Sequence, residues 1–140
     1  MAISKAANIS FRPAESEKIT INLGHVDLGR VDLLVQEGFY ANRTDFIRTA
    51  IRNQLSAERE ALAQSIARHT FELGLRDISA SELQAARQAN ALLHIRVVGL
   101  VRVAADVTPD LAAATIGSIK VLGSLQASPE VTAVIKDRIL

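Results

Sequence analysis

The sequence contains no cysteine and no tryptophan, and aromatic residues make up only 4% of its 140 positions. The absence of cysteine excludes disulfides, thiolate metal ligands and cysteine nucleophiles. Because apolar residues still reach 49%, the core must be built from Ile, Val, Leu and Ala. No apolar run approaches the roughly 18 residues of a membrane span, and residues 1–17 are too polar for a signal peptide. We therefore expect a cytoplasmic protein without membrane contact.

The chain also lacks an excess of charge of either sign, since its net charge is +1. This balance argues mildly against nucleic acid, because contacts to phosphate dominate the affinity of proteins for DNA. A DNA-binding hypothesis must therefore depend on where the charges lie. The acidic residues of the first expected helix are Asp27, Asp32 and Glu37, and the basic residues of the second are Arg43, Arg48 and Arg52.

Residues that could support catalysis or bind a metal are sparse. The three histidines, His25, His69 and His94, are scattered, and none has a second ligand at metal-binding spacing. No glycine-rich phosphate loop with its lysine and no nucleophile–base arrangement is visible. We expect no catalytic residues, no metal site, no cofactor and no enzymatic activity.

What the chain does contain is an alternating segment at residues 18–23. Such alternation is typical of a β-strand with two different faces. The apolar face holds Ile19, Ile21 and Leu23, and the polar face holds Lys18, Thr20 and Asn22. A lone strand is not stable in water, and no other strand candidate is near enough for a hairpin. We therefore expect it to pair with the same strand of a second copy. The DNA major groove admits such a two-stranded ribbon.

Two helices are expected after this strand. The first has an apolar stripe at three- and four-residue spacing and ends at Gly38, as helices often do just before glycine. The second begins after Asn42, a good N-cap. Asp45 lies three residues later, where an acidic side chain can accept a hydrogen bond in return, as in a capping box. A helix N-terminus flanked by Asn42, Arg43 and Thr44 can hold an anion such as a phosphate, or it can be an ordinary capped helix.

The pattern K-I-T-I-N-L, followed after a helix and a glycine by Y-A-N-R-T-D-F-I-R, resembles the ribbon-helix-helix DNA-binding proteins of the CopG/Arc/MetJ type. The resemblance covers residues 17–55 and implies an obligate homodimer on double-stranded DNA, with an antiparallel ribbon in the major groove. It implies base contacts from the outward strand positions, here Lys18, Thr20 and Asn22. It also implies phosphate contacts at the second helix, here Asn42, Arg43, Thr44 and Arg48, although Arg48 can equally be a solvated charge.

The chemistry of these side chains agrees with that implication. Lysine can donate to guanine, asparagine can pair with adenine through two hydrogen bonds, and the threonine methyl group can meet the thymine methyl group. One departure is Gly24-His25, where the family pattern leads us to expect proline at the turn.

No glycine or proline interrupts residues 42–73, so we expect the second helix to run on towards Gly74, with a kink near Ser56 as the alternative. Ser79 and Glu82 then form a capping-box pattern that predicts a helix over roughly residues 80–92.

The last third of the sequence contains two degenerate copies of a strand–turn–helix unit. Residues 94–103 are echoed by residues 118–127, with Gly99 aligned to Gly123. Each copy leads to a helix with proline at its first position, Pro109 or Pro129. The two glycines indicate a bulge or a close approach of backbones. The two copies could pair with each other or with a second subunit.

We therefore predict an α+β protein with four parts. These are a flexible arm at residues 1–16, a ribbon-helix-helix domain at 17–56, a helical extension or linker at 57–76 and a small mixed α/β module at 77–140. We interpret the last part as an oligomerisation module that joins dimers into a tetramer or larger assembly. A small-molecule sensor and a docking site for a protein such as a toxin are the alternatives.

The function we expect is sequence-specific transcriptional regulation, most simply repression at a palindromic or repeated operator. Two alternatives use the same DNA-binding end of the chain. One is an antitoxin that represses its own operon and neutralises a toxin through the C-terminal region. The other is a plasmid partition or relaxosome accessory protein. The apolar character of residues 91–140 argues against the charged, disordered tail of many antitoxins.

Overall fold

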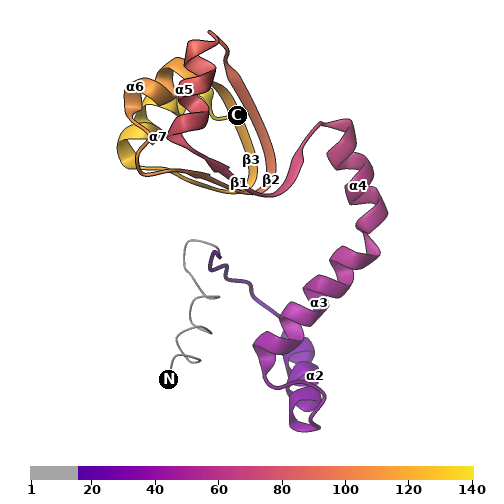
Figure 1. Ribbon diagram of the computed structural model, residues 1–140. Coiled ribbons are helices and arrows are strands. Elements are labelled where there is room, and N and C mark those ends of the chain that lie inside the picture. Colours follow the sequence, from indigo (N-terminus) through magenta and orange to yellow (C-terminus); the bar gives the residue numbers. More distant parts are fainter. Residues whose placement is uncertain (1–15) are drawn as a thin grey trace, which may run out of the picture. The chain divides into compact units, whose positions relative to one another are not determined.

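The computed structural model describes residues 16–140, so the arm predicted for residues 1–16 lies outside the described chain except for Ser16. The described residues divide into two compact units, residues 16–65 and residues 66–140. Figure 1 shows the helices and strands of each unit. None of the helices in residues 16–140 is long and apolar enough to cross a membrane.

The N-terminal unit is built from helices and contains very little core. Its helices are α2 (His25–Gln36) and α3 (Arg43–Ala57), followed by the start of α4 (Arg59–Arg68). Helix α2 ends as predicted before Gly38, which has a φ of 87°. The amide of Phe39 reaches back to the carbonyl of Leu34 at 3.0 Å, which completes a Schellman cap. Residues 16–24 form no helix and no strand within the described chain.

The second helix does not run on unbroken towards Gly74, so the first of the two expectations for it is wrong. It stops at Glu58, whose φ of −94° and ψ of 8° leave the helical region, and α4 starts at the next residue. The backbone of Glu58 serves both helices, because its amide donates to Gln54 and its carbonyl accepts from Leu62. The break lies two residues beyond the alternative kink at Ser56.

The predicted linker at residues 57–76 contains the start of a strand that the sequence pattern did not indicate. Helix α4 ends at Arg68, and β1 (Glu72–Ile78) follows after a short turn. The turn is a Schellman cap around Thr70, which has a φ of 55°, and the amide of Phe71 donates to the carbonyl of Ile66 at 3.0 Å. A β-branched residue rarely adopts this conformation, so the sequence carries no recognisable stop signal here.

The C-terminal unit contains a three-stranded parallel sheet in the order β1-β2-β3, with β2 at Leu93–Val103 and β3 at Ile116–Gln126. The two predicted copies pair with each other in the register that the sequence repeat suggests, with Ile95 beside Ile119. Strand β1 is a third, unrecognised copy, so the module is a threefold strand–helix repeat. Its sequence, ELGLRDI, contains good helix formers, and pairing with β2 overrides that preference.

Each strand is followed by a capped helix, and the structure confirms the predicted caps. The helices are α5 (Ala80–Gln88), α6 (Pro109–Thr115) and α7 (Pro129–Ile135), with a short 3₁₀ turn, η2, at Lys136–Arg138. The side chains of Ser79, Thr108 and Ser128 each accept a hydrogen bond from the third residue of the following helix. Helix α5 is shorter than the predicted 80–92, because Asn90 turns the chain with a φ of 53°.

The three helices cover one face of the sheet, as Figure 1 shows. The alternate strand residues on that face form a core with the helices. The largest fully buried side chains of this core include Ile78, Leu83, Val97, Val101, Ile116, Ile119, Val131 and Ile135. Parallel sheets are usually covered on both faces. This sheet is unusual because no helix of residues 66–140 lies on its opposite face.

A row of glycines crosses the middle of the sheet. Gly74 is paired with Gly99, and Gly99 is paired with Gly123. All three have a positive φ, of 121°, 140° and 127°. A Cβ atom on Gly99 would overlap the carbonyl oxygen of Gly74, and one on Gly123 would overlap that of Gly99. The predicted close approach of backbones at Gly99 and Gly123 is therefore confirmed.

Replacing Gly99 by alanine should destabilise the C-terminal unit much more than replacing Gly74. Both changes place a side chain at positive φ, which costs about 1–2 kcal/mol. Only Gly99→Ala adds a collision with backbone, whereas the space around Gly74 is open. Urea unfolding followed by circular dichroism should show a loss of about 1–2 kcal/mol for Gly74→Ala and at least about 3 kcal/mol for Gly99→Ala. Equal losses would contradict this explanation of the glycine row.

Candidate nucleic-acid interface

Residues 18–23 are fully available to a partner. All of them are exposed, and within the described chain they pair with no other strand. The apolar side of the segment is as open as the polar side, with Ile19 70% and Ile21 59% exposed. Lys18, Thr20 and Asn22 are likewise exposed, and no hydrogen bond or ion pair of residues 16–140 engages their side chains.

The start of α3 is capped from both directions. Asn42 is the N-cap, and its Oδ1 accepts a hydrogen bond from the amide of Asp45 at 2.8 Å. The carboxylate of Asp45 in turn accepts from the amide of Ala41 at 2.9 Å. This arrangement resembles a capping box and confirms the predicted N-cap. The amides of Arg43 and Thr44 remain at the helix end, where the helix dipole favours an anion.

The guanidinium of Arg43 forms a two-pronged ion pair that the sequence analysis did not find. Its Nε lies 2.7 Å from Oδ1 of Asp32 in α2, and a second nitrogen lies 2.8 Å from Oδ2. The hydrogen bonds from Arg43 hold the pKa of the Asp32 carboxyl below its usual value, and Asp32 raises the pKa of Arg43. Both side chains are about half exposed, so the pair is accessible to a competing anion.

The structure brings three of the four predicted phosphate-contacting residues together. Asn42, Arg43 and Thr44 occupy the N-cap and first turn of α3, and all three are exposed. Arg48 is exposed one turn further along, four residues after Thr44, which places it on the same side of the helix. Within residues 16–140, no hydrogen bond or ion pair joins this group to Lys18, Thr20 or Asn22.

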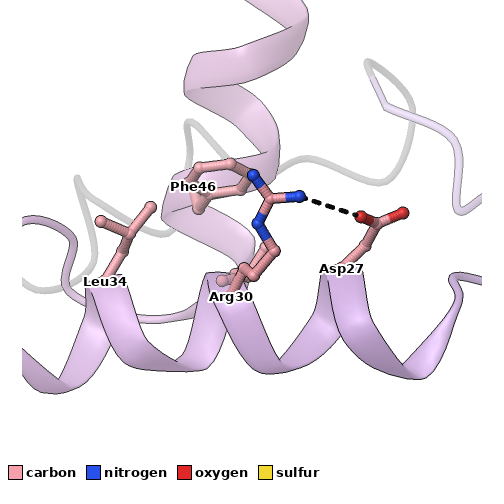
Figure 2. A pocket seen from close by; sticks show the side chains of 5 residues that line it. Asp27, Arg30, Leu34 and Phe46 are labelled. Atoms are coloured by element: carbon pink, nitrogen blue, oxygen red, sulfur yellow. Dashed lines mark ion pairs between the residues drawn. The ribbon is translucent and has the colours of Figure 1, made fainter.

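Helices α2 and α3 enclose an open hollow of about 290 Å³ (Figure 2). Its apolar lining comes from Val31, Leu34 and Phe46, and an ion pair between Arg30 and Asp27, 3.9 Å long, lies at its edge. A mostly apolar lining of this kind does not suit a phosphate. In residues 16–140, no group of three or more metal-binding side chains could hold a metal ion.

Comparison with known families identifies the family of the chain. The model of the ribbon-helix-helix transcriptional regulator family matches residues 14–132, which is most of the chain. The chain belongs to this family. Ribbon-helix-helix regulators are DNA-binding proteins without enzymatic activity, and they typically bind DNA as dimers. No curated protein and no solved structure matches the chain.

The family match extends well beyond the residues that carried the resemblance. Those residues ended at Leu55, whereas the match continues through the sheet and into α7. Residues 17–55 contain the recognisable spacing, and the C-terminal repeat has no motif of comparable specificity. The ribbon-helix-helix assignment therefore applies to both units of the described chain.

The carboxyl group of Asp32 should titrate below the usual aspartate value of about 3.9. Arg43→Ala should return that pKa towards the usual value, because it removes the two hydrogen bonds that favour the charged form. Since the folded-state pKa is lowered, the pair stabilises the fold above the unfolded-state pKa, and this contribution is lost as the pH falls through the folded-state pKa. Carbon-13 NMR titration of the carboxyl group measures the shift directly.

Arg30→Ala is the matched control for this titration, because Arg30 lies on the same helix as Asp32 but pairs with Asp27. It should leave the Asp32 titration unchanged. If Arg43→Ala and Arg30→Ala had the same effect, the pairing of Arg43 with Asp32 would be wrong.

Proposed function

We propose that this protein is a sequence-specific transcriptional repressor that inserts a ribbon made from residues 18–23 of two copies into the DNA major groove. The observation that carries the proposal is the exposure of this alternating segment on both its faces. The family supplies DNA binding and transcriptional regulation, and the segment supplies a candidate for the part that touches the bases.

The apolar face of the segment supports pairing between copies. Within residues 16–65 only Val31 is buried, although the unit carries many large apolar side chains. Burying one such side chain contributes about 1.5–3 kcal/mol, so covering the exposed set would strongly favour a dimer. The exposed members are Ile19, Ile21, Leu23, Val26, Leu33, Phe39, Ile51, Leu55 and Leu62. The apolar hollow between α2 and α3 offers a further place for a partner's side chain.

The polar face would read the DNA sequence. Lys18 can donate to guanine, Asn22 can form two hydrogen bonds with adenine, and Thr20 can meet a thymine methyl group. Two copies in an antiparallel ribbon present these side chains twice, related by a two-fold axis. A palindromic DNA site has the same two-fold symmetry.

The first turn of α3 would hold the DNA backbone. A phosphate at this helix end can accept hydrogen bonds from the amides of Arg43 and Thr44 and gains from the helix dipole. The Arg43 guanidinium is held beside the helix end by Asp32. A phosphate can compete for this guanidinium or share it, because both side chains are half exposed. Arg48 adds a second positive charge one turn further along.

The C-terminal unit would join ribbon dimers into a tetramer or larger assembly. One ribbon reads few bases, and linking dimers raises the effective concentration of the second ribbon at a repeated operator. Such linkage would also offset the near-neutral charge of the chain. The ordered core of this unit favours a packing role over an antitoxin tail that folds on its toxin.

The DNA that the protein occupies separates repression from the other roles. Sites overlapping a promoter fit a repressor, whereas sites at an origin of transfer or a partition locus fit a plasmid accessory protein. An antitoxin would copurify with a small toxin.

Replacing Lys18, Thr20 and Asn22 together by alanine should abolish the preference for the operator over unrelated DNA. The changes remove the proposed base contacts, each worth roughly 1–3 kcal/mol of discrimination, and leave the apolar face intact. A gel shift with the DNA upstream of the gene, in the presence of unrelated competitor DNA, measures the ratio of the two affinities. Retention of full specificity by the triple variant would show that the ribbon does not read the bases.

Arg43→Ala should weaken binding to all DNA sequences alike and reduce the slope of log K against log salt by about one. The expected cause is the loss of one phosphate contact and its released counterions. Arg87→Ala removes an equal charge from an exposed site in α5 and should change neither affinity nor slope. If the two variants behaved alike, the phosphate site would not be at α3.

A further inference from the structure

Within residues 66–140, the sheet has one face on which no helix packs, and this face is apolar. Helices α5, α6 and α7 cover the face to which Ile95, Val97 and Val101 point, and the alternate residues point the other way. The strand register places these alternate residues in two rows across the sheet. One row is Leu73, Val98 and Leu122, and the other is Leu75, Leu100 and Ser124.

We propose that this face, defined by Leu73, Leu75, Val98, Leu100 and Leu122, packs against the same face of a second copy of this chain. The proposal rests on the proposed function, because it names the surface through which the C-terminal unit would join copies. On the edge strands the apolar side chains are open to solvent, with Leu73 72% and Leu122 53% exposed. Parallel sheets occur almost only with both faces covered, so we expect a further protein surface to pack on this face.

A second copy is the occupant that the chain itself supplies. Members of the family typically bind DNA as dimers, so each ribbon dimer carries two copies of this face. Two ribbon dimers therefore meet through two pairs of faces. The first pair tethers the second and raises its effective concentration to the millimolar range, which allows a small apolar face to pair without a large intrinsic affinity. Each pair of identical faces is related by a two-fold axis, so a dimer of dimers is closed and leaves none of these faces exposed.

The charges at the two ends of the face favour one orientation. Arg96 and Lys120 are paired across β2 and β3 at one end, and Asp77 lies on the same face at the other end beside Arg102. With strands parallel between copies, the two basic pairs would lie against each other. With strands antiparallel, each basic pair would instead meet the end where Arg102 neutralises Asp77, which avoids the repulsion between like charges. We therefore assign an antiparallel, face-to-face arrangement.

The edges of the sheet are less suited to joining copies through this unit. The start of the β3 edge is partly occupied, because the amide of Leu140 donates to the carbonyl of Ile119 at 2.8 Å. No strand of residues 16–140 pairs with the outer edge of β1, but pairing through that edge would extend the sheet and still leave both apolar rows in water. Face-to-face packing covers both rows at once.

The test is a cross-link at the centre of the face. Because the chain has no native cysteine, only the introduced thiol can react. Val98 lies on the middle strand, so a Val98→Cys variant places two thiols across the interface. A bis-maleimide whose spacer matches the ~10 Å between packed sheets should convert most of the full-length chain to a covalent dimer. Val134→Cys, 40% exposed on α7, is the control outside the face and should give little covalent dimer.

Adding Leu75→Glu and Leu122→Glu to Val98→Cys should reduce the cross-link to the level of the Val134→Cys control, because charge would then be buried at the interface. Both leucines are more than half exposed in the single chain, so the fold should persist, and circular dichroism checks it. Should the pair of glutamates unfold the protein, Leu122→Gln alone provides the milder variant. Equal yields from Val98→Cys and Val134→Cys, or a yield that the polar substitutions leave unchanged, would overturn the proposal.

The same variants separate this proposal from the proposed function. The glutamate variant should keep its affinity for DNA that carries a single ribbon site, since residues 18–23 are untouched. The Lys18, Thr20 and Asn22 triple-alanine variant should lose specific DNA binding and keep the Val98→Cys cross-link.

Discussion

Large apolar side chains of residues 16–65 remain exposed within the described chain, and the proposed DNA-binding dimer depends on this constraint. Two helices and an alternating segment provide the hydrophobic material of a domain, but a single copy buries only Val31 among them. A monomeric unit would leave a large apolar surface in water, which soluble proteins avoid unless it is an interaction site. We therefore propose that dimerisation is a condition of folding for this unit, and that it leaves the polar face of the segment available to DNA.

The proposed phosphate site at the start of α3 is built with few charges. Asn42 and Asp45 cap the helix, and Asp32 fixes the Arg43 guanidinium beside it. The acid lowers the local positive charge, which limits non-specific attraction to DNA. It also holds a long side chain in one place, which would reduce the entropy lost in the proposed binding of a phosphate. The neutral composition of the chain is therefore compatible with DNA binding, because position matters more than total charge.

Much of this architecture could be predicted from local signals in the sequence, and the failures have identifiable causes. Asn42, Ser79, Pro109 and Pro129 mark helix starts because capping chemistry is local. Strand β1 was missed because Thr70, a β-branched residue, ends α4 at positive φ, and because pairing with β2 overrides the helical preference of residues 72–78. The pair of Asp32 and Arg43 joins two helices, so no sequence spacing could reveal it. The family could be recognised from the strand and helix spacing of residues 17–55, whereas the C-terminal repeat contains no motif that indicates it.

The most direct test of the central claim is a cysteine scan through residues 18–23, made possible by the absence of native cysteine. Each position in turn is changed to cysteine, and the full-length protein is oxidised mildly without DNA. An antiparallel ribbon about a two-fold axis brings one part of the segment opposite itself, within reach of a disulfide. The account predicts disulfide-linked dimers at one or two adjacent positions, with yields falling towards both ends of the segment. Uniformly low yields, no higher than that of a Ser81→Cys control in α5, would contradict it.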